Sequence, residues 1–490
     1  MSENPNNQKE HSKVFINNIK SGVIWNSLLA FGRQGLNFIA TIVLARLLHP
    51  EDYGLMGMMA VIISVSESLI DAGLAGALIK KKNVRKIDYS TLSLYNIGFS
   101  LFLYIVIFFS APFISLFYYT PILTNLLRLY ALIIVIESFS IVPKTILIKN
   151  LQFKKYSLVT IISGSFGLIT AVIMAVNDMG VYSLIWQYVI SSTILTILLY
   201  FFTGYKLNLS FSKLSFIEMF GFGFNTTMAN VLRGGTENLF INVVAKISSL
   251  TTTGFFNQSY KLQGVITSIS NTIIDGAFFP ILSKEDDDSI IRHSIKITSL
   301  SFTLMSALVF LLIIDADLAV YIVLGEKWMD TTPYLRILLC WGLIQMATSL
   351  NRNLLKSLAY TSSILRFEII STIICCIMLS LIIFGLGINY LLLALILYSL
   401  TRFLFSLIEL KIKCGLSLSC SIKVYVQAFF PSLLSCAIME LLSKMEIINN
   451  IIVTNLLFIM FAIIANKFLN ANTYFYIRNY SLKYVKNRLF

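Results

Sequence analysis

Long apolar runs follow one another along almost the whole chain, and they restrict the fold more than any other feature. Of the 490 residues, 57% are hydrophobic and only 13% are charged, about half the charged share of an average soluble domain. Runs of roughly 20 apolar residues, long enough to span a bilayer as helices, alternate with short polar turns. The chain therefore predicts an all-α polytopic membrane protein.

We expect about fourteen transmembrane helices. They are predicted near residues 22–48, 53–79, 90–117, 122–143, 156–176, 180–203, 214–246, 253–281, 292–314, 332–357, 362–384, 388–410, 424–442 and 447–468. The ninth and tenth spans are the least sharply bounded, because the connector from Asp315 to Pro333 is long and partly apolar. The first apolar run is too long for the core of a signal peptide, so we interpret it as a retained span.

The basic residues predict the orientation in the membrane. One alternating set of loops, with the N-terminus and the C-terminal tail, holds 28 Lys and Arg residues, and the other set holds only Lys327 and Lys444. The positive-inside rule then places both termini in the cytoplasm. The same rule explains the formal net charge of +14, so no nucleic-acid partner is expected.

An internal repeat accompanies these spans. At an offset of 200 residues, rare intramembrane cations and glycines coincide: Arg33 with Arg233, Arg46 with Lys246, and Gly54 with Gly254. At a slightly larger offset, Leu127-Arg128 coincides with Leu335-Arg336. We therefore expect two six-helix lobes in a pseudo-twofold arrangement, followed by two further helices.

This repeat gives a predicted domain organisation. It consists of a cytoplasmic segment 1–21, an N-terminal lobe 22–203, a cytoplasmic linker 204–213, a C-terminal lobe 214–410, a two-helix hairpin 411–468 and a basic, aromatic tail 469–490.

The cations inside the spans indicate a transported anion. A charged side chain in a bilayer faces a protein-lined, water-filled cavity in most cases. Arg33 and Arg233 are predicted near mid-span, and Lys261 lies early in the eighth span. Four further candidates lie toward the ends of spans, where they either guide release of the cargo or extend to the membrane interface: Arg46, Lys246, Arg128 and Arg336.

Acidic and amide side chains in the spans leave two interpretations open. All five acids could couple transport to an ion gradient, and all of them except Glu137 could instead pair with Arg33 and Arg233. They are Glu67, Asp71, Glu137, Glu237 and Asp275. The amides, which include Asn238, Asn242 and Asn257, either line a sugar path or form hydrogen bonds between helices.

We find no arrangement typical of an enzyme or of a metal site. The three His residues lie far apart, the six Cys residues form no CxxC pair, and no Walker-type loop is present. We therefore expect neither a cofactor nor a bound metal, and no catalytic residue.

Several motifs resemble those of a known family. Residues 45–55, Ala-Arg-Leu-Leu-His-Pro-Glu-Asp-Tyr-Gly-Leu, resemble the "ARLL-P-E-YG" signature of bacterial polysaccharide exporters. Residues 71–80 are similar to its "D-GL--ALI" segment, residues 111–118 to its "AP-I--FY" segment, and residues 324–328 to its "LG-KW" loop. The family belongs to the multidrug/oligosaccharidyl-lipid/polysaccharide (MOP) superfamily. The most similar subgroup contains the repeat-unit flippases for O-antigen, colanic acid and teichuronic acid.

The resemblance implies a flippase for undecaprenyl-pyrophosphate-linked oligosaccharides, which works by alternating access around a cationic cavity in surface polysaccharide biosynthesis. Arg33 and Arg233 would then contact the pyrophosphate. The implied partners are the lipid-linked oligosaccharide, membrane lipids, and the polysaccharide polymerase with its chain-length machinery, and we expect a monomer. Two alternatives remain open, an ion-coupled drug/cation antiporter of the same superfamily and a membrane polysaccharide polymerase or transferase.

Overall fold

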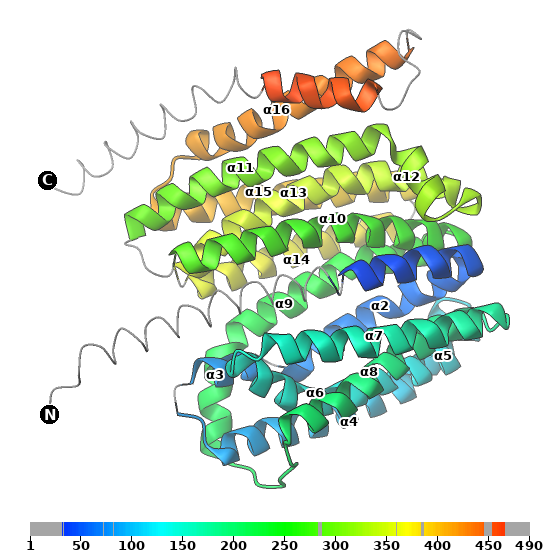
Figure 1. The fold of residues 1–490 in the computed structure, drawn as a ribbon, viewed down its shortest axis with the longest axis vertical. Helices are drawn as coiled ribbons and strands as arrows, with labels where there is room; N and C mark the ends of the chain where they lie inside the picture. Colours follow the sequence, from blue (N-terminus) through cyan, green and yellow to red (C-terminus); the bar gives the residue numbers. More distant parts are fainter. Residues whose placement is uncertain are drawn as a thin grey trace, which may run out of the picture. The chain divides into compact units, whose positions relative to one another are not determined.

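The computed structural model describes residues 32, 34–71, 73–81, 83–282, 287–358, 360–383, 387–444 and 453–465. All regular structure in this part of the chain is helical (Figure 1). The predicted all-α polytopic fold is therefore confirmed.

Two short apolar helices, Gln34–Leu47 and Val453–Ala465, flank the labelled elements. Between them lie α2 (Pro50–Asp71), α3 (Leu74–Lys80), α4 (Lys86–Phe117), α5 (Leu123–Tyr130), α6 (Leu132–Lys149), α7 (Phe153–Val176), α8 (Val181–Thr203), α9 (Lys213–Ile247), α10 (Leu250–Leu282), α11 (Asp287–Ile314), α12 (Ala316–Val323), the 3-10 helix η1 (Glu326–Thr331), α13 (Thr332–Ser357), α14 (Thr361–Ile383), α15 (Ile388–Cys414) and α16 (Leu418–Lys444).

The helices coincide with the predicted spans, and the differences have local causes. The span predicted at 53–79 is divided into α2 and α3 at Gly73, whose φ of 69° a glycine adopts without steric cost. The connector from Asp315 to Pro333 is ordered rather than irregular, because it forms α12 and η1. The first half of the span predicted at 22–48 lies largely outside the described residues.

Within the described residues, eight helices are long and apolar enough to cross a membrane, or nine if α11 and α12, bent by 78°, are counted as one broken span. Three helices of similar length, α9, α10 and α13, carry cations along their length, including Arg233, Lys261 and Arg352. Polar helices of this kind face a protein interior or a water-filled path in a membrane protein. The total of fourteen spans stays a prediction.

Residues Met1–Asn257 form one compact unit. Within it α7 packs along α8, α6 packs against α4 and α8, and α9 packs along α2 (Figure 1). The crossing of α7 and α8 is close, because a Cβ atom on Gly167 would lie 2.6 Å from the carbonyl oxygen of Gln187. Glycine at this position lets the two backbones approach, as in many membrane helix pairs.

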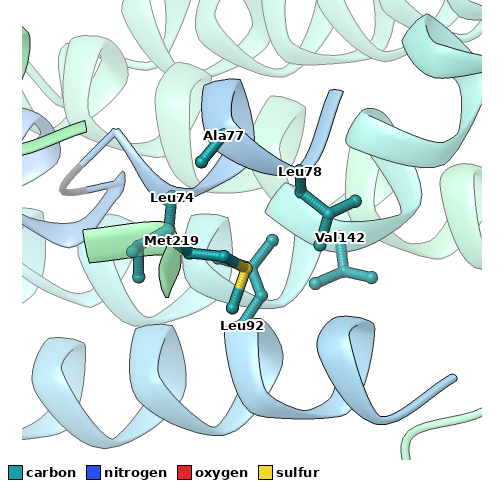
Figure 2. Packing of buried hydrophobic residues seen from close by; sticks show 6 residues of the cluster. All are labelled: Leu74, Ala77, Leu78, Leu92, Val142 and Met219. Carbon is teal, nitrogen blue, oxygen red and sulfur yellow. The ribbon is translucent and has the colours of Figure 1, made fainter. Parts of the chain in front are cut away.

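A small core holds the first half of α9 in this unit. Figure 2 shows its six side chains, which come from α3, α4, α6 and α9: Leu74, Ala77, Leu78, Leu92, Val142 and Met219. Met219 on α9 is only 2% exposed. Because lipid is as apolar as this core, shape-matched packing rather than exclusion of water stabilises it.

A reciprocal glycine contact supports the internal repeat. A Cβ atom on Gly54 would overlap the carbonyl oxygen of Leu250, and one on Gly254 would overlap the carbonyl oxygen of Pro50. Each residue of this contact has its counterpart 200 positions away, so the contact is self-complementary, as across a local twofold axis. The offset predicted from sequence is thus present at this junction of α2 with α10.

Residues Gln258–Phe490 form the second compact unit. Within it α11 packs against α16 and α13, and α15 packs against α13 and α14. A polar contact links α13 to α16, since the Tyr425 hydroxyl donates to Asn351 Oδ1 at 2.7 Å. The residues 204–212 connect α8 to α9 without a helix. The predicted lobe boundaries, which depend on the sequence repeat, stay a prediction.

Candidate functional site

The two helices α2 and α9 carry several of the predicted site residues, and they run antiparallel. A Cβ atom on Gly57 would contact Ile241, whereas one on Gly235 would contact Val65 at 3.2 Å. Rising numbers along α2 therefore meet falling numbers along α9. Arg233 lies just beyond Gly235 along this shared interface, in the middle of the 35-residue helix α9.

Amide side chains connect these helices to their neighbours. Asn238 Nδ2 donates to Ser64 Oγ on α2 at 3.1 Å, and the Tyr118 hydroxyl donates to Asn242 Oδ1 at 2.8 Å. Asn257 Nδ2 donates to the carbonyl oxygen of Tyr53 at 2.7 Å. For these three asparagines the structure favours hydrogen bonding between segments over a role in lining a sugar path.

Arg233 is partly buried, and its Nε has no hydrogen-bond partner among the described residues. The predicted alternative was an ion pair with Glu67 or Glu237, but neither carboxylate pairs with Arg233 in the described structure. A buried donor without a partner is costly. The side chains of the other two predicted partners, Asp71 and Asp275, lie outside the described residues, so the binding of an anion by Arg233 stays a prediction. Its repeat partner Arg33 lies outside the described residues.

The remaining predicted cations are at different places in the fold. Lys261 is half-buried on α10 in the second unit, and Arg46 is exposed near the end of the helix Gln34–Leu47. Arg128 stacks 4.1 Å from the ring centroid of Phe108 and donates to its carbonyl oxygen.

The other two cations at helix ends also have local partners. Lys246 Nζ lies 4.2 Å from the ring centroid of Phe117 and bonds to that residue's carbonyl oxygen. Arg336 Nη2 lies 2.8 Å from Asp317 Oδ2, with both side chains largely exposed. These contacts suit anchors at the membrane interface, and a role in guiding cargo stays a prediction.

Two of the five predicted acids lie near one another in the first unit. Glu137 on α6 accepts a hydrogen bond from Ser192 Oγ at 3.0 Å. The charge of Glu137 acts on Glu67 of α2. Glu237 lies half-buried on α9. The side chains of Asp71 and Asp275 lie outside the described residues.

Sequence reasoning missed an ionic cluster where α3 ends and α4 and α9 begin, a region that we call the basic end. Lys81 Nζ contacts Glu218 at 2.8 Å and Asp88 at 3.3 Å, and Arg85 Nη2 contacts Asp88 at 3.3 Å and Ser215 Oγ at 3.1 Å. Its hydrogen bond to Glu218 raises the pKa of Lys81. The available signal was Asp88 three residues after Arg85, the spacing of a helix cap.

Sequence reasoning left the partner of Arg402 open, and the structure decides it. Arg402 Nη2 lies 2.8 and 3.0 Å from the two oxygens of Glu368, and both side chains are buried. Arg352 Nη1 lies 3.6 Å from the same carboxylate. This cluster in the second unit joins α13, α14 and α15.

The sequence profile of the family described as "Polysaccharide biosynthesis protein" matches residues 43–333. The chain belongs to this family. The match includes the helices α2 to α12 and the residues Arg233, Glu67 and Glu137. This family is the one that the resemblance of the motifs predicts.

Four curated relatives are 23–27% identical to the chain. An "Uncharacterized membrane protein in cps region" of Klebsiella pneumoniae is 27% identical over 71% of this chain and 73% of its own length. The "Lipopolysaccharide biosynthesis protein WzxC" of Escherichia coli K12 is 25% identical over 72% of each chain. The "Teichuronic acid biosynthesis protein TuaB" of Bacillus subtilis 168 is 24% identical over 69% of this chain and 71% of its own length.

Solved structures show the same fold. A structure of the "Lipid II flippase MurJ, inward closed conformation" has a TM-score of 0.65 at 17% identity and covers 91% of this chain and 98% of its own. An inward-facing "multidrug resistance MATE family transporter of the MOP superfamily" has a TM-score of 0.56 at 14% identity and covers 79% of this chain and 99% of its own.

Proposed function

We propose that this protein is a flippase that moves undecaprenyl-pyrophosphate-linked oligosaccharide repeat units from the cytoplasmic to the periplasmic leaflet by alternating access around a cationic cavity. The observation that carries the proposal is Arg233, a partly buried cation on a membrane-length helix that pairs with none of the described carboxylates. It occurs in a chain of the polysaccharide biosynthesis family.

The chemistry of such a cargo explains why an arginine is needed. The prenyl tail can stay in lipid, but the charged head group must cross about 30 Å of hydrocarbon. An anion without a partner is very costly to bury there. A guanidinium group binds two phosphate oxygens at once through charge-assisted hydrogen bonds. Arg233, with Arg33 as its repeat partner, would supply that contact.

The names of the relatives support the class of cargo. They connect WzxC with lipopolysaccharide, TuaB with teichuronic acid and the Rhizobium meliloti protein ExoT with succinoglycan transport. The structural neighbour MurJ is named a flippase. The three names share the biosynthesis of a polymer that contains sugars. The cargo in our proposal is a precursor of such a polymer, and the transporter carries out no catalysis on it.

The proposal also includes the orientation of the protein in the membrane, its partners and a coupling site. Both termini lie in the cytoplasm, the protein lies in the inner membrane as a monomer, and a polymerase with its chain-length machinery consumes the exported unit. Glu67 and Glu137, whose charges interact, are the candidate coupling site. A pair of carboxylates of this kind can hold a cation in one state and release it in another.

The test is deletion of the gene in its host, with extraction of the lipid-linked oligosaccharide. We expect surface polymer to disappear and the lipid-linked unit to accumulate on the cytoplasmic side. Wild type should restore export, and Arg233→Ala should restore at most about a tenth of it, since losing a charge-assisted contact costs roughly 1.5–3 kcal/mol.

Arg366→Ala is the matched control, because Arg366 is exposed, donates to Ser363 Oγ on its own helix and has no predicted cargo role. It should restore export to the wild-type level when inserted in the membrane at an equal amount. Unchanged export in a deletion strain with no second flippase would contradict the proposal and favour the drug/cation antiporter.

A further inference from the structure

Seven aromatic rings from α4, from α9 and from the segment just before α9 form a connected row, which starts near the basic end. Neighbouring ring centroids in this aromatic row are 6.1 Å apart for Phe211–Phe216, 5.5 Å for Phe216–Phe220, 5.4 Å for Phe220–Phe224, 5.1 Å for Tyr95–Phe216, 5.5 Å for Tyr95–Phe99 and 6.1 Å for Phe99–Phe102. The contact between Tyr95 and Phe216 joins the two helices.

Helix periodicity explains why the rings align. Phe216, Phe220 and Phe224 are four residues apart, so they lie on one stripe of α9. That stripe is roughly 12 Å long at 1.5 Å per residue. Tyr95 and Phe99 have the same spacing on α4.

One side of the aromatic row packs against the protein core, and the other side is exposed at the protein surface. Tyr95, Phe216 and Phe220 pack against the core cluster of Figure 2. Phe102, by contrast, is 57% exposed and Phe224 is 40% exposed. The rings therefore form a rigid apolar surface that a ligand can contact without first ordering flexible side chains.

Cations lie where the aromatic row begins. Lys213 is exposed and precedes Phe216 by three residues, on the same face of α9. The Arg85 side chain is 62% exposed and touches Ser215, the neighbour of Phe216 in sequence.

The acids at this place do not cancel the positive charge. Asp88 is fully buried beneath Arg85, and Glu218 is paired with Lys81. The exposed residues Arg85, Lys86 and Lys213 therefore leave an excess of positive charge at the start of the aromatic row.

We infer that the aromatic row is the docking surface for the prenyl tail of a polyprenyl-diphosphate lipid, with the diphosphate beside Lys213 and Arg85. The inference rests on the proposed function and adds a place of first contact, distinct from Arg233, to it. The anionic head of such a lipid would lie against the cations at the start of the aromatic row, and its long apolar tail would lie along the rings that follow. The methyl-branched, unsaturated tail contacts ring faces along its whole length, and many weak contacts add up.

The test uses the full-length protein in lipid nanodiscs and native mass spectrometry with undecaprenyl pyrophosphate as the probe. The variant is Phe216→Leu with Phe220→Leu, which removes two rings but keeps their apolar volume nearly unchanged. The matched control is Phe109→Leu with Phe113→Leu, two exposed rings in the other half of α4. Phosphatidylglycerol serves as an anionic lipid without a prenyl tail.

We expect the aromatic-row variant to bind undecaprenyl pyrophosphate about tenfold more weakly, since each lost aromatic contact contributes measurably. The control should bind within twofold of wild type. Both variants should keep wild-type affinity for phosphatidylglycerol, which shows that each is inserted and folded. Lys213→Gln should weaken binding of the probe as well, through the lost charge.

Two results would overturn the inference in distinguishable ways. The tail does not dock here if wild type and the aromatic-row variant bind undecaprenyl pyrophosphate with equal affinity. The same conclusion holds if the variant loses as much affinity for phosphatidylglycerol as for undecaprenyl pyrophosphate. In both cases the proposed function is untouched. If wild type does not bind undecaprenyl pyrophosphate at all, the proposed function fails together with the inference.

Discussion

The substitution Glu368→Gln should destabilise the second unit, and it should do so more than the same change at the exposed carboxylate of Asp317. Glu368 is 1% exposed and lies between two guanidinium groups. Glutamine keeps the size of the side chain but removes its charge. The variant therefore leaves Arg402, whose side chain is 5% exposed, without its counter-charge.

The geometry sets the size of the effect. Arg402 Nη2 lies within hydrogen-bond distance of both oxygens of Glu368, at 2.8 and 3.0 Å. Removing one partner of a buried pair costs about 3–5 kcal/mol. Arg352, at 3.6 Å and 20% exposed, is better hydrated and changes this value little. We expect a loss near the lower limit, about 3 kcal/mol, because the unfolded state of a membrane protein also finds polar partners.

The chain contains a matched control at the same distance. Arg336 and Asp317 are also 2.8 Å apart, but their side chains are 44% and 57% exposed. An exposed pair contributes about 0–1 kcal/mol. Asp317→Asn makes the same chemical change as Glu368→Gln, so the difference between the two variants measures the effect of burial together with the weaker second contact to Arg352. The assay is equilibrium unfolding of purified protein in mixed micelles.

A double variant completes the test. Glu368→Gln with Arg402→Met removes both buried charges, and replacing a buried ion pair by uncharged residues is often close to neutral. It should therefore be more stable than Glu368→Gln alone. The reasoning is refuted if Glu368→Gln costs no more than Asp317→Asn, or if the double variant is the least stable of the three.

Two other comparisons test a backbone contact and an ionic cluster. Gly254→Ala should destabilise the protein by about 3 kcal/mol, since its Cβ atom would overlap the Pro50 carbonyl oxygen. Gly264→Ala has open space around its Cβ position and should be neutral in the same unfolding assay, and equal effects of the two variants would argue against the close contact. Asp88→Asn should cost about 1.5–3 kcal/mol because it weakens buried charge-assisted hydrogen bonds, and Glu218→Gln, at a side chain 60% exposed, should stay within about 1 kcal/mol. A thermal melt of each purified variant decides this, and a larger loss for Glu218→Gln would show that the basic end depends on its exposed ion pair.

Helix positions were predictable because a bilayer imposes one length and one polarity on every span. The ends of α7, α8 and α9 accordingly lie within a few residues of their predicted limits. The repeat was also readable, because the rare intramembrane cations Arg33 and Arg233 coincide at the same offset as Gly54 and Gly254. What could not be predicted is the break at Gly73, since an apolar sequence does not reveal where its backbone changes conformation.

The site was predictable in residue type but not in pairing. Cations within spans were recognisable from sequence because they are rare, and the same holds for Asn238 and Asn242. Their partners come from other helices, however, and sequence separation says nothing about which side chains meet. The Tyr118 hydroxyl contacts Asn242 across 124 positions of sequence, a contact that only the packing of the helices determines.

Three arginines illustrate how environment assigns a role to one side chain. Arg336 pairs with an acid at the surface, where the pair contributes little, and Arg402 pairs with an acid in the interior, where each partner makes the other tolerable. Arg233 is partly buried, and no described carboxylate pairs with it. A buried cation that the fold has already neutralised cannot also bind a diphosphate without losing its acid. Of these three, Arg233 is therefore the one to which we assign the cargo in our proposal.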